Sequence, residues 1–180
     1  MKFKDAQIMA IHKFDTEDFL TRIKEEDDSM LQHLPILKKM NEKGFITTQS
    51  QAGRKSGGVN KPYVIEERAF VEGFMSYKKA VTFLKKMNLY TDKNATNIID
   101  NPKFLKSELD IPLTITTQNN KTNIHTHMSL SLPIKILNSY KKEHKINRSE
   151  NVLYVFCWDP IWNRNASNID GLFTDVLRHL

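Results

Sequence analysis

The sequence predicts an α+β protein with a mixed β-sheet, an antiparallel hairpin and helices packed on the sheet. Three observations favour this class. Apolar residues recur at helical spacing in several separate segments. Val152 to Trp158 is apolar throughout, which is typical of a strand that is covered on both faces. Two runs that flank Asn119 and Asn120 have matching apolar faces, as in a hairpin. Helices alternating with such strands indicate layers of helix and sheet.

The composition indicates one globular domain, residues 1–180, in a reducing compartment. The chain has 39% hydrophobic and 27% charged residues, a balance typical of proteins with a packed core. A single cysteine excludes an internal disulfide framework and a zinc site made of several cysteines. The sequence shows no secretory signal, and no apolar run approaches the ~20 residues of a membrane-spanning helix. We therefore expect a cytoplasmic protein that does not associate with a membrane and has neither cofactor nor metal.

The first third of the chain predicts two helices and a strand. Asp15 and Thr16 precede acidic residues, a pattern that favours the start of a short helix. A second helix is expected from about Ser29, with lysines near its end and Gly44 as its stop. Phe45 to Thr48 then has the composition of a strand and leads into a glycine-rich loop.

The segment from Tyr63 to Met75 is open to two interpretations. Its aromatic residues are compatible with one helical face, whereas its valine, isoleucine and phenylalanine content favours a strand. We predict a strand, with Gly73 at a bulge or at a close approach to a neighbour. Ser76 then caps a helix, whose inward residues are expected to be Tyr77, Ala80, Val81, Leu84 and Met87.

The hairpin prediction includes a register. Asn119 and Asn120 suit a two-residue loop, because asparagine tolerates the positive φ angles of a primed turn. With this loop the two strands present the same apolar face, which supports the assignment. The expected cross-strand pairs are Ile115 with Ile124, Thr114 with His125 and Ile111 with Met128.

The remaining elements of the second half follow from similar patterns. The polar stretch from Thr91 to Asp110 predicts at most a helical turn near Phe104. Pro133 to Lys145 has the apolar spacing of a helix, and Leu172 to Leu177 indicates a closing helix.

Asp159 lies just past the end of the apolar strand and is a candidate for a site. In open α/β sheets, ligands gather at the carboxyl ends of strands. Trp162 and Arg164 follow closely and would supply a stacking surface and a cation. In the alternative interpretation, Asp159 caps a turn, Trp162 covers the edge of the core and Arg164 pairs locally.

Three segments resemble the motifs of an uncharacterised family found in actinobacteria and in some large viruses. Asn41 to Gln51 resembles N-x-x-G-F-x-T-x-x-S-Q, residues 67–75 resemble the strand Q-R-A-x-V-x-G-F, and Asp159 to Arg164 resembles D-P-x-W-x-R. The chain departs from the pattern at Glu67, where glutamine is expected, and at Ala52, where proline is expected. The resemblance implies a strand, loop, strand and helix in the first half. It implies no established activity.

The leading functional hypothesis is that the domain binds a small polar or anionic ligand. A catalytic role is a further option. Hydroxyl and amide groups gather just after the first strand, and a pocket would form if this edge lies beside the C-terminal segment. Asp159 would act as the general base, and the arginines would hold an anionic group. The expected ligand-binding residues are Thr47, Ser50, Gln51, Arg68, Trp162 and Arg164.

Two alternatives remain open from the sequence. The net charge of +6 would attract polyanions, so the first is a nucleic-acid-associated protein that contacts phosphates through lysines and one arginine. The second is a viral protein-interaction factor whose acidic residues 1–30 meet a basic partner. The sequence leaves the oligomeric state open. The expected nucleic-acid-binding residues are Arg54, Lys55, Lys78, Lys79, Lys85 and Lys86.

Overall fold

The computed structural model describes residues 1–58, 61–88, 95–99, 110–129 and 134–180. The helices in these ranges are α1 (Phe3–Lys13), α2 (Glu17–Asp27), the 3-10 helix η1 (Asp28–His33), α3 (Leu34–Glu42), α4 (Tyr77–Asn88), α5 (Ile134–Glu143) and α6 (Leu172–His179). The strands are β1 (Phe45–Gln51), β2 (Lys55–Gly57), β3 (Tyr63–Glu67), β4 (Phe70–Ser76), β5 (Ala95–Ile99), β6 (Asp110–Gln118), β7 (Lys121–Ser129) and β8 (Val152–Trp158).

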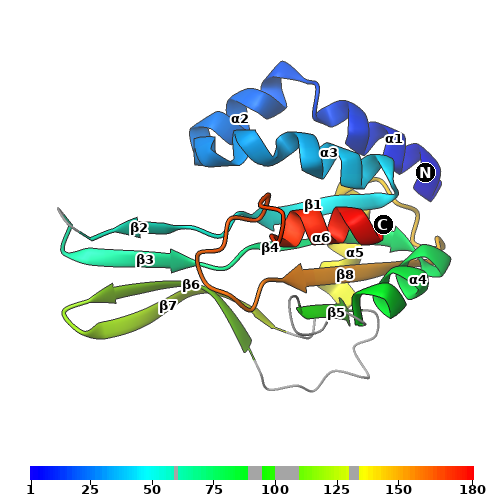
Figure 1. The fold of residues 1–180 in the computed structure, drawn as a ribbon. Helices are drawn as coiled ribbons and strands as arrows, with labels where there is room; N and C mark the ends of the chain where they lie inside the picture. Colours follow the sequence, from blue (N-terminus) through cyan, green and yellow to red (C-terminus); the bar gives the residue numbers. More distant parts are fainter. Residues whose placement is uncertain (59–60, 89–94, 100–109, 130–133) are drawn as a thin grey trace.

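The strands form two four-stranded sheets, with the orders β1-β4-β8-β5 and β2-β3-β6-β7 (Figure 1). The α+β class, the hairpin and the packed helices are thus confirmed. The structure differs from a single mixed sheet, since every pairing within the described residues is antiparallel. The expected strand from Tyr63 to Met75 is interrupted at Arg68 and Ala69, so β3 joins the second sheet and β4 the first.

Helices cover both faces of the first sheet, whereas the second sheet extends away from them (Figure 1). On one face, side chains of β1, β4 and β8 pack with α3, α4 and α6. On the other, they pack with α1 and α5. Along β8, Val155 and Cys157 face the first of these clusters, and Tyr154 and Phe156 face the second. The prediction that this strand is covered on both faces is therefore confirmed.

A tight corner joins α3 to β1. Gly44 has a φ angle of +87°, which a residue with a side chain rarely adopts. Across the corner, Asn41 Nδ2 donates to Thr47 Oγ1 at 2.8 Å, and the Thr47 N–H donates to Asn41 Oδ1 at 3.1 Å. A Cβ atom on Gly73 of β4 would lie only 2.0 Å from the Ile46 carbonyl oxygen, so the predicted close approach is confirmed.

The hairpin between β6 and β7 has the expected loop, and its register contains one correction. Asn119 and Asn120 have φ angles of 50° and 60°, as a primed turn requires. The pairs Ile115–Ile124 and Ile111–Met128 are confirmed. Thr114 pairs with Thr126 instead of His125, because an irregularity in the ladder shifts the register by one residue.

Several local predictions need correction. Three elements, α1, β2 and β5, were not expected from the sequence. α1 has no continuous apolar face that would have predicted a helix. Ala6 is its one buried residue, and Ile8 and Met9 are exposed. On α4, Tyr77 is exposed although it was expected inside, and Phe83 is buried instead. The helical turn expected near Phe104 lies outside the described residues.

Candidate functional site

A cavity of about 380 Å³ lies between the N-terminal helices and the first sheet. β1 is the edge strand of that sheet, so its outer side faces α1, α2, η1 and α3 instead of another strand (Figure 1). The strand contributes a polar wall, and the helices contribute a largely apolar one. The polar wall consists of Thr47, Thr48, Gln49, Ser50 and Gln51. The apolar lining consists of Ala10, Phe14, Phe19, Ile23, Met30, Leu34, Leu37 and, from β4, Phe70.

Two cations lie beside one aromatic ring of the cavity. Lys13 Nζ is 5.2 Å from the centre of the Phe19 ring, and Arg22 Cζ is 5.6 Å from it. Phe14 packs edge-on against the same ring, with the centroids 5.3 Å apart. Burial lowers the pKa of Lys13, and the charge of Arg22 lowers it further. Carboxylates already lie near both cations: Arg22 Nε is 3.8 Å from Glu26 Oε1, and the charges of Glu143 and Glu26 oppose the lowering of the Lys13 pKa.

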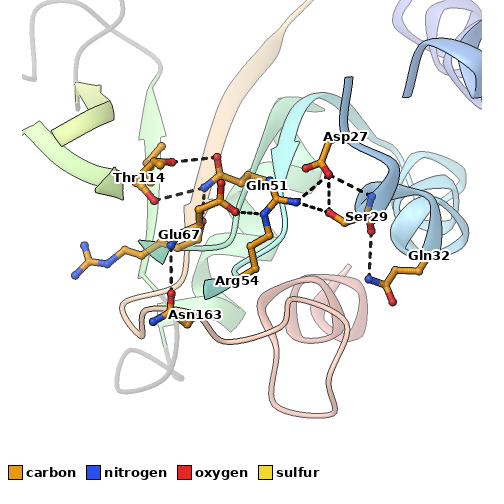
Figure 2. Close-up of polar contacts among 10 residues, drawn as sticks. Asp27, Ser29, Gln32, Gln51, Arg54, Glu67, Thr114 and Asn163 are labelled. Atoms are coloured by element: carbon orange, nitrogen blue, oxygen red, sulfur yellow. Dashed lines mark hydrogen bonds and ion pairs between the residues drawn. The ribbon is translucent and has the colours of Figure 1, made fainter. Parts of the chain in front are cut away.

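Carboxylates gather at another part of the cavity lining, where they are held by Arg54. Figure 2 shows the guanidinium of Arg54 between Asp27 and Glu67. Its Nε atom is 2.7 Å from Glu67 Oε2, and its Nη1 atom is 3.0 Å from Asp27 Oδ1 and 2.9 Å from Ser29 Oγ. Burial raises the pKa of Glu67, although the charge of Arg54 opposes this shift. Arg54 therefore ties the end of α2 to β3.

The expected ligand-binding residues on β1 line the cavity, and two of them also hold the backbone. Thr47 is bonded to Asn41 at the corner described above. Gln51 Nε2 donates to the Arg68 carbonyl oxygen at 2.9 Å, and Gln51 Oε1 accepts from Thr114 Oγ1 at 3.4 Å (Figure 2). Ser50 is half-buried in the same wall.

The other expected site residues lie apart from the cavity lining. Asp159 is fully buried and forms a two-bond ion pair with Arg164, with Nε–Oδ2 and Nη2–Oδ1 distances of 2.6 Å. Asp159 Oδ1 also accepts the Ile161 N–H at 2.8 Å. Arg68 stacks on Trp162, with 4.3 Å between its Cζ atom and the ring centre. The rule about carboxyl edges concerns parallel sheets, and β8 pairs antiparallel with both neighbours. This geometry favours the alternative in which Asp159 and Arg164 pair locally.

A buried acidic residue that the sequence analysis did not single out lies one strand behind the cavity wall. Glu72, on β4, is fully buried, and both of its carboxylate oxygens lack a hydrogen-bond partner among the described residues. Burial raises its pKa to about 7, and the nearby Tyr154 hydroxyl acts in the opposite direction. The signal in the sequence was a carboxylate inside the apolar run from Phe70 to Met75.

Hydroxyl groups connect the surroundings of Glu72 to the polar wall. The Tyr154 hydroxyl lies 2.7 Å from Thr48 Oγ1, which donates to the Glu72 carbonyl oxygen at 3.2 Å. Gln49 is opposite Glu72 in the β1–β4 ladder, and its Nε2 atom donates to the Tyr140 hydroxyl at 3.3 Å. Burial raises the pKa of both tyrosines, and the charge of Glu72 adds to this shift.

The lysines expected to contact nucleic acid have different environments. Lys79 Nζ donates to the Leu180 carbonyl oxygen at 3.0 Å, and Lys86 Nζ donates to that of His179 at 3.1 Å. These contacts suit the negative C-terminal end of α6. Lys55, Lys78 and Lys85 are exposed, and Lys55 Nζ lies 3.8 Å from Glu66 Oε1.

The described residues contain no cluster of three or more His, Cys, Asp or Glu side chains with the geometry of a metal site. None of the helices in the same ranges has the length and hydropathy needed to cross a bilayer.

The chain belongs to a family described as a domain of unknown function (DUF6919), whose model matches residues 16–180. The match agrees with the expected uncharacterised family. The assignment of its motifs and its occurrence in actinobacteria and large viruses stay predictions. No curated protein matches the chain.

Proposed function

We propose that this DUF6919 domain binds a small amphiphilic anion, one with an apolar body and a single negatively charged group, in the cavity beside β1. The observation that carries the proposal is the pairing of an apolar helical wall with a polar strand wall across one cavity. Its volume of about 380 Å³ falls in the range of sites for small molecules, roughly 300–1,000 Å³.

The two walls and the cation pair suggest how such a ligand would lie. Its apolar body would pack against Phe14, Phe19 and Ile23, because burial of apolar surface is the main source of affinity in such sites. Its charged group would lie near Lys13 and Arg22. Hydrogen-bonding groups on the ligand would face the hydroxyl and amide side chains of β1, which fix orientation more than affinity.

This proposal restricts the expected small polar or anionic ligand to an amphiphilic anion, and it includes no catalysed reaction. Both carboxylate oxygens of Asp159 accept hydrogen bonds from the chain, so we assign it a structural role instead of that of a general base. The nucleic-acid alternative receives less support, because Arg54, Lys79 and Lys86 donate to protein groups. The viral interaction factor has no specific support among the contacts described.

The proposal is tested with 8-anilinonaphthalene-1-sulfonate, an aromatic sulfonate whose fluorescence rises in apolar sites. We expect saturable binding to the folded protein and roughly fivefold weaker affinity in Arg22→Met, which corresponds to ~1 kcal/mol for one partly exposed charge contact. Lys24→Met is the matched control, because Lys24 is exposed on the same helix and lies outside the cavity lining.

A second variant tests whether the probe binds in this cavity. Ser50→Trp places a large side chain in the cavity and should abolish probe binding while circular dichroism shows a cooperative thermal transition close to that of the wild type. Undiminished binding in Ser50→Trp, or equal weakening in Arg22→Met and Lys24→Met, would refute the assignment of the probe to this cavity.

A further inference from the structure

Glu72 occupies an unusual position for a carboxyl group. It lies on β4, between β1 and β8, and none of its surface is exposed. Its neighbours on the same face of the sheet are apolar or aromatic and include Phe70, Phe74 and Phe156. A buried polar group without a hydrogen bond costs free energy, so one that a native protein retains calls for a physical explanation, such as a functional role or a bound water. Among the described residues neither oxygen of Glu72 has a partner in good hydrogen-bond geometry, although the Tyr154 hydroxyl is near enough that hydrogen bonding to it lowers the pKa of Glu72.

The cavity wall lies directly beside this carboxyl group. Gln49 is its neighbour in the β1–β4 ladder, and the ladder is irregular at Thr48, between Thr47 and Gln49. Thr48 and Gln49 both line the cavity. Because Thr48 donates to the Glu72 carbonyl oxygen, its remaining hydrogen bond is one that it accepts from the Tyr154 hydroxyl.

We propose that Glu72 is a proton-binding switch behind the cavity wall, so that ligand binding in the cavity is coupled to protonation of this carboxyl group. The ligand in this inference is the one in the proposed function. The proton-binding role rests on the geometry of Glu72. With Glu72 protonated, Tyr154 donates to Thr48 and the wall keeps the arrangement described. An ionised Glu72 requires donors, and the Tyr154 O–H turns from Thr48 to the carboxylate. Thr48, a residue of the cavity wall, then loses the hydrogen bond that it accepts from Tyr154.

The sign of the coupling follows from the charge of the ligand. An anion in the cavity is repelled by an ionised carboxylate one strand away, so it binds more tightly when Glu72 is protonated. Two negative charges ~10 Å apart at an effective dielectric constant of about 20 change an affinity on the order of tenfold. Since burial raises the pKa of Glu72 to about 7, this change falls between pH 6 and pH 8.5.

Other titratable groups near the site behave differently. Among the described side chains, Tyr154 from β8 and Tyr140 from α5 face Glu72, and burial raises the pKa of both, so they stay neutral in this range. His144 lines the cavity, and burial lowers its pKa. Glu67 lines it as well, with its pKa raised by burial. Lys13 lines the cavity too, with its pKa lowered by burial and by the charge of Arg22, so these three groups are the rival sources of a pH effect.

The first measurement is the affinity for 8-anilinonaphthalene-1-sulfonate from pH 5.5 to pH 8.5, because the sulfonate itself stays ionised throughout. We expect the affinity to fall on the order of tenfold with a midpoint near pH 7 in the wild type. In Glu72→Gln the affinity should stay at its low-pH value. A step that persists in Glu72→Gln and disappears in His144→Gln or Glu67→Gln would overturn the proposal.

A second measurement detects protonation of Glu72 in the absence of ligand. The infrared carbonyl stretch of a protonated carboxyl group should be present at pH 6, decline near pH 7 and be absent from Glu72→Gln. If the sulfonate binds nowhere but this band titrates, the proposed function and its coupling fail, and what stands is the titration of Glu72 near pH 7. If the sulfonate binds and the band is absent at pH 6, the switch fails and the proposed function stands. Should Glu72→Gln not fold, Tyr154→Phe replaces it. Tyr154→Phe removes the hydroxyl that lowers the pKa of Glu72, so the band and the pH step in binding must move together to higher pH, and a step that stays in place while the band moves overturns the coupling.

Discussion

Replacing Glu72 by glutamine should remove a specific dependence of stability on pH. The folded protein holds the pKa of Glu72 at about 7, against an ordinary value of 4.5. A pKa raised from 4.5 to about 7 corresponds to about 3.5 kcal/mol of differential interaction between the two protonation states. Because the folded-state pKa is the higher one, the folded protein binds the proton more tightly. The associated stability is fully present below about pH 4.5 and is lost as the pH rises through about 7.

Urea unfolding at pH 5 and pH 8.5 measures this effect. In the wild type, Glu72 should lower the free energy of unfolding by about 2.5 kcal/mol between the two pH values, and in Glu72→Gln this contribution should be absent. His33 and His144 change the free energy of unfolding in the opposite direction. Burial lowers their pKa values, so the stability that they contribute to the protein is lost as the pH falls. They are present in both proteins, so the difference between the two pH dependences isolates Glu72. Equal pH dependences would refute the reasoning.

Two further predictions concern the scaffold of the site. Asn41→Ala removes both hydrogen bonds to Thr47 and leaves its N–H without a partner, so the free energy of unfolding in urea should fall by about 2 kcal/mol. An unchanged midpoint would contradict the corner described. Asp159→Asn weakens the buried pair with Arg164 and should lower the melting temperature and cost about 3 kcal/mol. Asp170→Asn is its control, since this exposed carboxylate lies 3.8 Å from the same arginine and should cost less than about 0.5 kcal/mol. Equal losses of unfolding free energy in the two variants would show that the buried ion pair stabilises the protein no more than the exposed one.

The elements that local chemistry determines could be predicted from the sequence. Asn119 and Asn120 specified a primed turn, and the loop fixed most of the register of the hairpin. Gly44 ended α3, and the run from Val152 to Trp158 was long enough and apolar enough to identify a strand covered on both faces. In each case the deciding interaction lies within a few residues along the chain, or in the periodicity of one segment.

Tertiary contacts decided the features that sequence reasoning missed. The break at Arg68 and Ala69 separates two sheets, yet both flanking segments have the composition of strands. The position of Asp159 after a strand suggested a site in the sequence, and the local pairing of Arg164 was stated there only as the alternative that this geometry favours. The cavity itself requires α1 and α2 to fold over β1, and α1 has little periodic signal to predict this.

Some of the residues that suggested a family hold the frame of the site, whereas others, such as Ser50 and Gln51, also line the cavity. Asn41, Gly44 and Thr47 form the corner that positions β1, and Asp159 with Arg164 fixes the segment after β8 by a buried ion pair. These residues determine where the edge strand runs and therefore where the cavity lies. They leave the choice of ligand to the side chains that face the cavity from β1 and the N-terminal helices. Substitutions in the frame are therefore expected to change stability first, whereas substitutions in the lining are expected to change the proposed ligand binding. Experiments on function are best directed at the lining and at Glu72 behind it.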